Sequence, residues 1–226
     1  MKTLLDHKLL SLFIVLLSLT GCKEDIVNPP ADILALTSLK GRVINWTLGD
    51  SVIALAGRQQ NIYGRGESLF IFGTSHVNND GSFSLALSNP PPDLLMGYAN
   101  GNYRFSDTAK FCNMLGLILR YPNASFDSKL LHNASEPFSV FISDTAKIGD
   151  YYCYFEYADR DVNMVGTDTY WHDNPPNADT IFTRHDLHYK KGWNRIVSTI
   201  ISKETHSRIE LRTVKNVSEG HWYYEY

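Results

Sequence analysis

The amino-acid sequence predicts an all-β protein, an antiparallel β-sandwich with little helix. From Thr37 onward, short runs rich in Val, Ile, Phe, Tyr and Thr are separated by Gly, Asn, Asp and Pro, which is typical of strands joined by turns. Apolar and polar residues alternate within several runs, and no long apolar stripe has the 3.6-residue helical period. The 226 residues can bury one large core or two small ones.

Residues 1–21 resemble a bacterial secretory signal. Lys2 and Lys8 lie before or beside an apolar run, Leu9 to Leu19, which is shorter than the ~20 residues of a membrane-spanning helix. The run continues into Thr and Gly before Cys22, which resembles the lipobox of bacterial lipoproteins, whose cysteine receives diacylglycerol and becomes the new N-terminus. We therefore expect a signal peptide over residues 1–21 and a lipid anchor at Cys22. The alternative is a buried N-terminal helix with a chance cysteine.

Residues 22–36 have little pattern and include two consecutive prolines, so we interpret them as a tether. Lys23, Glu24 and Asp25 resemble the signal that sends some Gram-negative lipoproteins to the outer face of the cell. The alternative is that these residues are only a polar linker. The expected location is the outer membrane, with the fold facing either the cell surface or the periplasm.

Four strands are expected between residues 37 and 90. In the first of them, Leu39 and Val43 share one face, and Lys40 and Arg42 share the other. A tight-turn signal, Asn-Asp-Gly ending at Gly81, precedes the fourth strand and predicts a hairpin. The expected strands are Leu39–Thr47, Ser51–Ala56, Leu69–Thr74 and Ser82–Leu87.

The same segment resembles the carboxypeptidase-regulatory-like module, a transthyretin-type (prealbumin-like) β-sandwich common in exported bacterial proteins. The resemblance implies a fold for residues 37–90 and no catalytic residues. Since about fifty residues make a small core, we expect this module to pack on further strands of residues 91–226, within the same globular unit or beside it. The residues that carry the resemblance are Gly41, Val43, Trp46, Asp80, Gly81, Ser82, Phe83 and Leu85.

The region 91–226 is also expected to be rich in strands. Thr108–Tyr121 is interpreted as a helical turn that continues as a strand over Leu115–Arg120, and Pro137–Ser143 as a strand. In the last strand, alternation places Trp222 and Tyr224 on one face and Tyr223 on the other. The remaining expected strands are Tyr151–Tyr157, Val162–Thr167, Thr180–Tyr189, Trp193–Ile201, Ser207–Thr213 and His221–Tyr226.

With Cys22 lipidated, Cys112 and Cys153 remain. A disulfide between them can persist outside the inner membrane, and the alternative is two buried thiols that behave as small hydrophobic side chains. Sequence alone does not bring their Cα atoms within bridging distance, so both readings stay open.

Several classes of function lack support in the sequence. The net charge of −3 gives no basic surface for nucleic acid. The chain contains no Gly-x-Ser-x-Gly elbow, His-Glu-x-x-His motif, Cys-x-x-Cys pair or phosphate loop, and no cofactor is expected. His185 and His188 are three residues apart, so on a strand they point to opposite faces and predict no metal site.

Two groups of residues remain as candidates for ligand binding. Trp171, His172 and Asp173 begin a polar loop, where a tryptophan ring can stack on a sugar and the polar groups can bind its hydroxyls. Asp186 and His188 share one face of a strand. The favoured function is a membrane-anchored, non-enzymatic binding or structural module with a glycan or peptide ligand. The alternative is an enzyme, or an enzyme accessory, that acts on extracellular glycan or peptide.

Overall fold

The computed structural model places most of the chain after the expected tether in one compact unit, Ile33–Tyr226. It describes residues 34–49, 53–62, 66–98, 102–114, 116–120, 129–143, 145–172, 179–205, 207–216 and 220–224. The expected signal peptide and the lipid anchor at Cys22 lie outside these residues. Among the described residues, no helix is long and apolar enough to cross a membrane.

The predicted all-β class is confirmed, because the described residues form one continuous sheet of 14 strands with very little helix. A 3₁₀ turn, η1 (Pro92–Leu94), and one helical turn, α2 (Phe138–Phe141), interrupt the strands. The strands are β1 (Ser38–Val43), β2 (Ile53–Ile62), β3 (Gly66–His76), β4 (Ser82–Ala86), β5 (Tyr103–Phe105), β6 (Phe111–Met114), β7 (Leu117–Arg120), β8 (Lys129–Ala134), β9 (Tyr151–Ala158), β10 (Val162–His172), β11 (Asp179–Tyr189), β12 (Gly192–Glu204), β13 (Ser207–Val214) and β14 (His221–Tyr224).

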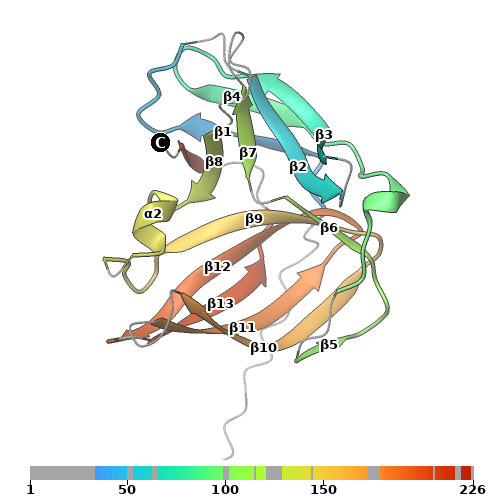
Figure 1. The fold of residues 1–226 in the computed structure, drawn as a ribbon, viewed down its shortest axis with the longest axis vertical. Coiled ribbons are helices and arrows are strands. Elements are labelled where there is room, and N and C mark those ends of the chain that lie inside the picture. The colour runs from blue at the N-terminus through green and yellow to red at the C-terminus, as the bar shows by residue number, and fades with distance from the viewer. Residues whose placement is uncertain are drawn as a thin grey trace, which may run out of the picture. The chain divides into compact units, whose positions relative to one another are not determined.

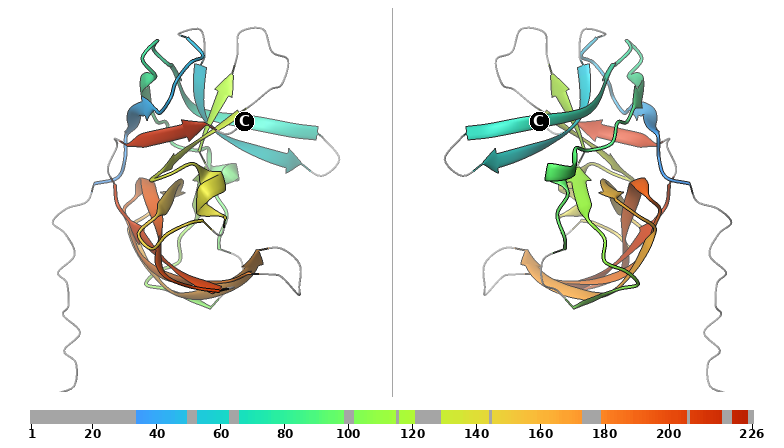
Figure 2. Two further views of the ribbon diagram at one scale, coloured as in Figure 1. Left: turned by 90° about the vertical axis from the view of Figure 1, so that its left-hand side faces the viewer. Right: turned by 90° about the vertical axis from the view of Figure 1, so that its right-hand side faces the viewer.

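The sheet folds back on itself, so that its two ends form two layers, as in a sandwich (Figure 1). Its path runs β3-β2-β7-β8-β9-β12-β13-β11-β10-β5, with β1, β4 and β14 attached beside β8 and with β6 on β9. Figure 2 shows that β9 to β13 curve into a trough below the other strands. Most pairs are antiparallel, but β1–β14 and β11–β13 are parallel.

Strand β9 divides the interior, because its successive side chains point to opposite faces. Phe155 and Tyr157 enter the core beneath β1–β4, where Trp193 and Trp222 are also buried. Tyr154 lies on the other face and packs against the core of the trough, which includes Met164 among its buried residues. One strand therefore joins both layers.

The alternation predicted for the first strand is confirmed, since Leu39 and Val43 are buried while Lys40 and Arg42 are exposed. The predicted turn before β4 also forms, with Gly81 at a φ of 81°. The hairpin, however, is wrong. β4 pairs with β1, and β3 pairs with β2. The turn residues specify a reversal of the chain, but they do not specify which strand edge is filled next.

Two other expectations in the middle of the chain are corrected, and two strands appear that were not expected. Pro137–Ser143 contains the helical turn α2 and no strand, because Pro137 starts it and its carbonyl accepts from Val140 N at 2.9 Å. The described part of Thr108–Tyr121 holds two strands, β6 and β7, and no helical turn. The strand expected over Leu115–Arg120 is present as β7. β5 and β8 were not predicted. Short apolar runs fit a helical turn and a strand equally well, and tertiary packing decides between them.

The last strand fills the gap between β1 and β8. Trp222 is 1% exposed, stacks on Phe155 with ring centroids 5.7 Å apart, and donates its indole N–H to Lys40 O at 3.4 Å. Trp222 is therefore part of the hydrophobic core.

The two cysteines are buried thiols that are not joined in a disulfide. Cys112 lies opposite Tyr157 on β9, whereas Cys153 lies on β9 itself, four residues away. At ~3.3 Å per residue the Cα atoms are about 13 Å apart along the strand, well beyond bridging distance.

We predict that iodoacetamide alkylates both Cys112 and Cys153 when the chain is unfolded in guanidinium without reductant. In the folded protein neither should react over the same time, because both are buried and burial raises the pKa of Cys153 to about 11. Peptide mass spectrometry gives the readout, and a disulfide-linked Cys112–Cys153 peptide pair would contradict the structure.

Candidate functional site

The structure places the candidates from the sequence in different surroundings. Trp171 and His172 are the last residues of β10, Asp173 lies beyond the described residues, and the side chains of Trp171 and His172 also lie outside them. Asp186 and His188 share a face of β11, as predicted, and this face is the outer, exposed one. Their side chains are 3.1 Å apart, from His188 Nε2 to Asp186 Oδ1. The structure does not bring these two residues to the inner face of the trough.

The inner face of the trough carries the polar residues that the sequence interpretation missed. On β13, Arg208 and Glu210 are buried, while the apolar Ile209 between them is partly exposed on the outer face. In a half-buried strand the apolar Ile209 would face inward and its charged neighbours outward. On β13 the charged side chains face inward instead. Charged side chains turned inward mark this face as the candidate site.

The strand register places one residue from each of five neighbouring strands in a row across the trough. Arg212 on β13 lies opposite Ser198 on β12 and His185 on β11. The row continues to Gly166 on β10 and from there to Tyr103 on β5. Directly paired residues in such rows have Cβ atoms about 5 Å apart, so these side chains form one continuous surface.

Gly166 allows this row to close. An added Cβ there would lie 2.3 Å from Asn102 O, so any other residue would push β5 away. With β5 in place, the Tyr103 ring packs edge-on against the His185 ring, with centroids 5.0 Å apart. An isolated glycine inside a strand was the one signal in the sequence that could have pointed to this close approach.

Each oxygen of the Glu210 carboxylate accepts a hydrogen bond from a neighbouring side chain. Arg208 Nε donates to Glu210 Oε1 at 2.9 Å, and Ser198 Oγ donates to Glu210 Oε2 at 2.7 Å. Arg208 also donates to Phe141 O at 2.8 Å and lies over the Phe141 ring. The one carboxylate between the two inward arginines of β13 is therefore paired with Arg208.

Arg212 is left without such a partner. Its Nε atom is buried and makes no hydrogen bond within the described part of the chain. Its guanidinium lies 5.6 Å from the centroid of the Tyr154 ring, a cation–π contact. Unpartnered buried donors are rare in folded proteins and mark strain, ligand sites or sites of bound water.

His185 is 6% exposed, and neither of its ring nitrogens has a hydrogen-bond partner among the described residues. Burial and, to a smaller extent, the Arg212 charge lower its pKa to about 4, against the opposing effect of Asp168. The ring is therefore neutral near pH 7, with one nitrogen as donor and one as acceptor. The buried Thr183 hydroxyl, two residues away on the same face, is also unpartnered.

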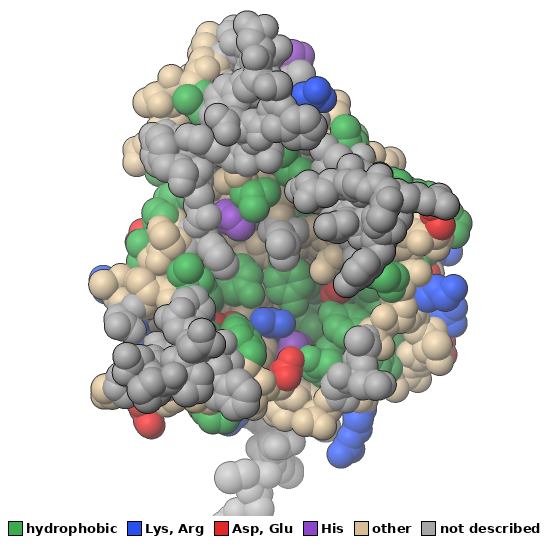
Figure 3. Space-filling model, in the orientation of Figure 1, with side chains coloured by type: hydrophobic (Ala, Val, Ile, Leu, Met, Phe, Trp, Pro, Cys, Tyr) green, Lys and Arg blue, Asp and Glu red, His purple; other side chains and the backbone are tan. Residues whose placement is uncertain are grey.

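Tyrosines surround Arg212 and His185. Burial raises the pKa of Tyr103 and of Tyr152 to about 12, so both hydroxyls stay protonated. Tyr103 donates to Asp168 Oδ2 at 2.7 Å. We call this surface the tyrosine–arginine basin and define it as Tyr98, Tyr103, Tyr152, Tyr154, Tyr170, Thr183, His185 and Arg212. Figure 3 looks into the trough, where basic, acidic and histidine side chains lie together in a hollow among hydrophobic ones.

A buried carboxyl group lies at the end of the basin nearest β6. Tyr189 donates to Glu156 Oε2 at 2.5 Å, and Tyr98 lies 3.1 Å from both carboxyl oxygens. Burial raises the pKa of Glu156 above its ordinary value. Both oxygens of this group are thus engaged by tyrosine hydroxyls.

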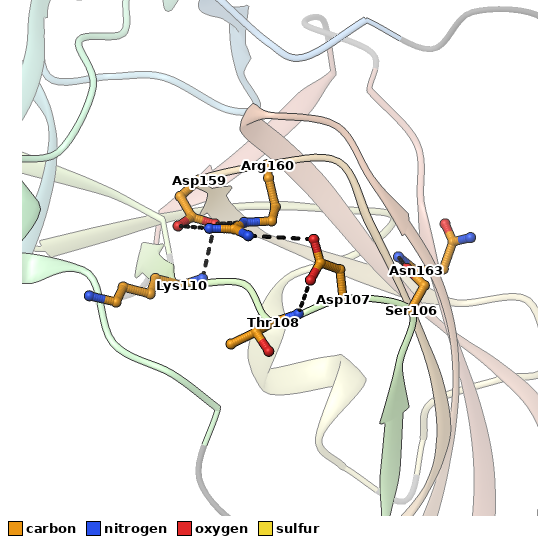
Figure 4. A network of polar contacts seen from close by, with 7 residues as sticks. All are labelled: Ser106, Asp107, Thr108, Lys110, Asp159, Arg160 and Asn163. Carbon is orange, nitrogen blue, oxygen red and sulfur yellow. Dashed lines mark hydrogen bonds and ion pairs between the residues drawn. The ribbon is translucent and has the colours of Figure 1, made fainter.

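An exposed polar network holds β5 and β6 against the end of β9 (Figure 4). Arg160 Nε donates to Asp159 Oδ1 at 3.1 Å, and the same oxygen accepts from Lys110 N at 3.1 Å. Arg160 also reaches Asp107 Oδ2 at 3.4 Å. Asp161 accepts from the Lys191 backbone N–H, which lowers its pKa. These carboxylates have cationic and backbone partners, and they hold the β5 edge of the basin in place.

A second hollow of about 540 Å³ lies on the other layer, and Arg42, Phe83 and His221 contribute to its lining. Its Arg42 pairs with Asp80 at 2.6 Å. Since this arginine already has a carboxylate partner, the tyrosine–arginine basin is the stronger candidate.

The unpartnered groups of the basin can form hydrogen bonds with a ligand. Among the described residues, no group of three His, Cys, Asp or Glu side chains could hold a metal ion. The unpartnered atoms are a guanidinium nitrogen, a neutral imidazole and a hydroxyl, which bind polar ligand atoms by hydrogen bonds.

Comparison of the chain with protein-family models, curated protein sequences and solved structures finds no significant match.

We predict that protonation of His185 destabilises the fold. The unfolded chain binds a proton below the ordinary pKa of 6.5, whereas folded His185 does so only near 4, so the free energy of unfolding falls as the pH drops between these values. The loss is at most about 3 kcal/mol. Urea titrations of H185Q should show a shallower fall from pH 6.5 to 4.5 than the unsubstituted protein.

The control is H188Q, which removes the exposed histidine on the outer face of the same strand. This variant keeps His185, so it should still lose stability as the pH drops below 6.5. If H185Q and the unsubstituted protein lose stability equally over this range, the buried and neutral state of His185 is contradicted.

Proposed function

We propose that the protein is an exported lipoprotein, anchored through Cys22 to the outer membrane, that binds a polar extracellular ligand in the tyrosine–arginine basin without transforming it. Export and anchoring rest on the signal-like residues 1–21 and on the lipobox-like end before Cys22. The binding role rests on the geometry of the trough. The basin replaces the loop at Trp171 as the leading binding surface, although that loop follows β10 and so starts from the same layer.

One observation carries the binding role, namely the cluster of unpartnered buried polar groups on neighbouring strands. Leaving a buried donor or acceptor unsatisfied costs about 1–3 kcal/mol each. Thr183, His185 and Arg212 present such groups on the same face of the sheet. A ligand that forms the missing hydrogen bonds removes this cost, and the difference contributes to the free energy of binding. Binding is therefore the use that best explains why these side chains point inward.

The second candidate function is an enzyme that acts on extracellular glycan or peptide. Glu156 favours it, because a buried carboxyl group with a raised pKa can serve as a general acid. Against it, both oxygens of Glu156 are engaged by Tyr98 and Tyr189, which leaves no described nucleophile–base pair beside Arg212. Turnover of any bound ligand, abolished by E156Q with folding intact, would favour the enzyme.

We predict that R212M weakens ligand binding at least tenfold, because a hydrogen bond to a charged group contributes about 1.5–3 kcal/mol. The measurement is isothermal titration calorimetry of the full chain against panels of glycans, small acids and peptides. The matched control is R184M, which removes an exposed arginine from the outer face of β11. Equal binding by R212M and the unsubstituted protein, for every ligand bound, would refute the basin as the site.

We also predict that C22A releases the protein from the membrane fraction. The cysteine is the proposed attachment point of the lipid, and the described residues contain no helix that could span a membrane. Fractionation of cells that express C22A should find the chain outside the membrane pellet, whereas C153A, which removes a buried thiol, should stay in the pellet. Membrane retention of C22A would contradict the anchor.

A further inference from the structure

We infer that the ligand of the tyrosine–arginine basin is a carboxylated sugar, a hexuronate residue of an acidic glycan. This inference rests on the proposed binding function and specifies the ligand.

The charge of the basin calls for one anionic group. Among the described residues, Arg212 is a cation of the basin without a contacting carboxylate, because Glu210 is bound by Arg208 and Ser198. Of the other acids that face the basin, Glu156 accepts from Tyr98 and Tyr189, and Asp168 accepts from Tyr103 at the exposed rim. A guanidinium presents a planar fork that matches the two oxygens of a carboxylate. The first requirement is thus a carboxylate on the ligand.

The second requirement is hydroxyl groups close to that carboxylate. Neutral His185 has one acceptor nitrogen, which an ionised carboxylate cannot satisfy because it carries no hydrogen. A hydroxyl both donates and accepts, so it can pair with either nitrogen of His185 and with the Thr183 hydroxyl. His185 and Arg212 are direct cross-strand partners, so the ligand must carry both kinds of group within about 5 Å, as one sugar ring does.

The surroundings favour a sugar over a peptide. Tyrosine rings line the basin, and aromatic rings stack on the apolar faces of sugars. Extended peptides usually bind by adding a strand to a free sheet edge. Where β11 and β13 carry His185 and Arg212, each strand pairs with a strand on both sides, whereas β10 pairs with β5 only over Met164–Gly166. At His185 and Arg212 the inner face of the sheet therefore offers a ligand side chains and no free backbone groups, which suits a compact ring.

The test is calorimetry of the full chain with five probes: galacturonate, galactose, cyclohexanecarboxylate, inorganic phosphate and an acidic tetrapeptide. Galacturonate should bind at least tenfold tighter than galactose, which lacks the carboxylate, and at least tenfold tighter than cyclohexanecarboxylate, which lacks the hydroxyls. R212M should abolish the preference over galactose, and H185F should reduce the preference over cyclohexanecarboxylate. R184M should change neither. Circular dichroism of each variant monitors folding.

A second variant guards against a simple loss of structure. R212K keeps a positive charge but lacks the planar fork, so it should retain part of the preference for galacturonate over galactose. Tighter Arg212-dependent binding of phosphate, of the peptide or of galactose would overturn the sugar-acid inference while leaving the binding function in place. No Arg212-dependent binding of any probe would overturn the inference and count against the proposed function as well.

Discussion

The buried ion pair between Arg208 and Glu210 is the interaction on which the inner face of the trough depends. It allows β13 to turn its charged side chains inward, because each charge has a partner and Ser198 satisfies the remaining carboxylate oxygen. It also affects Arg212, the next inward residue of β13. Because Glu210 pairs with Arg208, Arg212 is a second inward arginine without a carboxylate contact among the described residues.

The second constraint is that successive side chains of each trough strand point to opposite faces of the sheet. On β9, Phe155 packs into the core beneath β1–β4 while Tyr154 faces the trough, so the basin is built on strands that the cores hold in place. A site carried by a paired sheet is more rigid than one carried by loops, and a rigid site loses less entropy on binding. The network at Asp159 and Arg160 fixes the β5 edge in the same way (Figure 4).

Alternation predicted most strands, the inward face of β1, and the opposite orientations of His185 and His188. It could not predict that β4 pairs with β1, because the turn at Gly81 specifies a reversal and not a partner. It also missed the basin. A strand with charged residues at alternate positions has the same period whichever face is buried, and only the Arg208–Glu210 pair, seen in three dimensions, makes the charged face the inner one. The lipid anchor at Cys22 and the loop at Asp173 stay predictions.

The central claim is that the buried cation Arg208 is paired with a carboxylate, whereas Arg212, whose Nε atom is buried, is not. The most direct test compares the replacement of each arginine by methionine. Removing one partner of a buried pair is strongly destabilising, about 3–5 kcal/mol, whereas removing an unpaired buried charge relieves a desolvation cost. The measurement is urea unfolding of R208M and R212M without ligand. We expect R208M to lower the free energy of unfolding by ~3 kcal/mol and R212M to leave it unchanged or to raise it by ~1 kcal/mol. Equal destabilisation by the two substitutions would contradict the account.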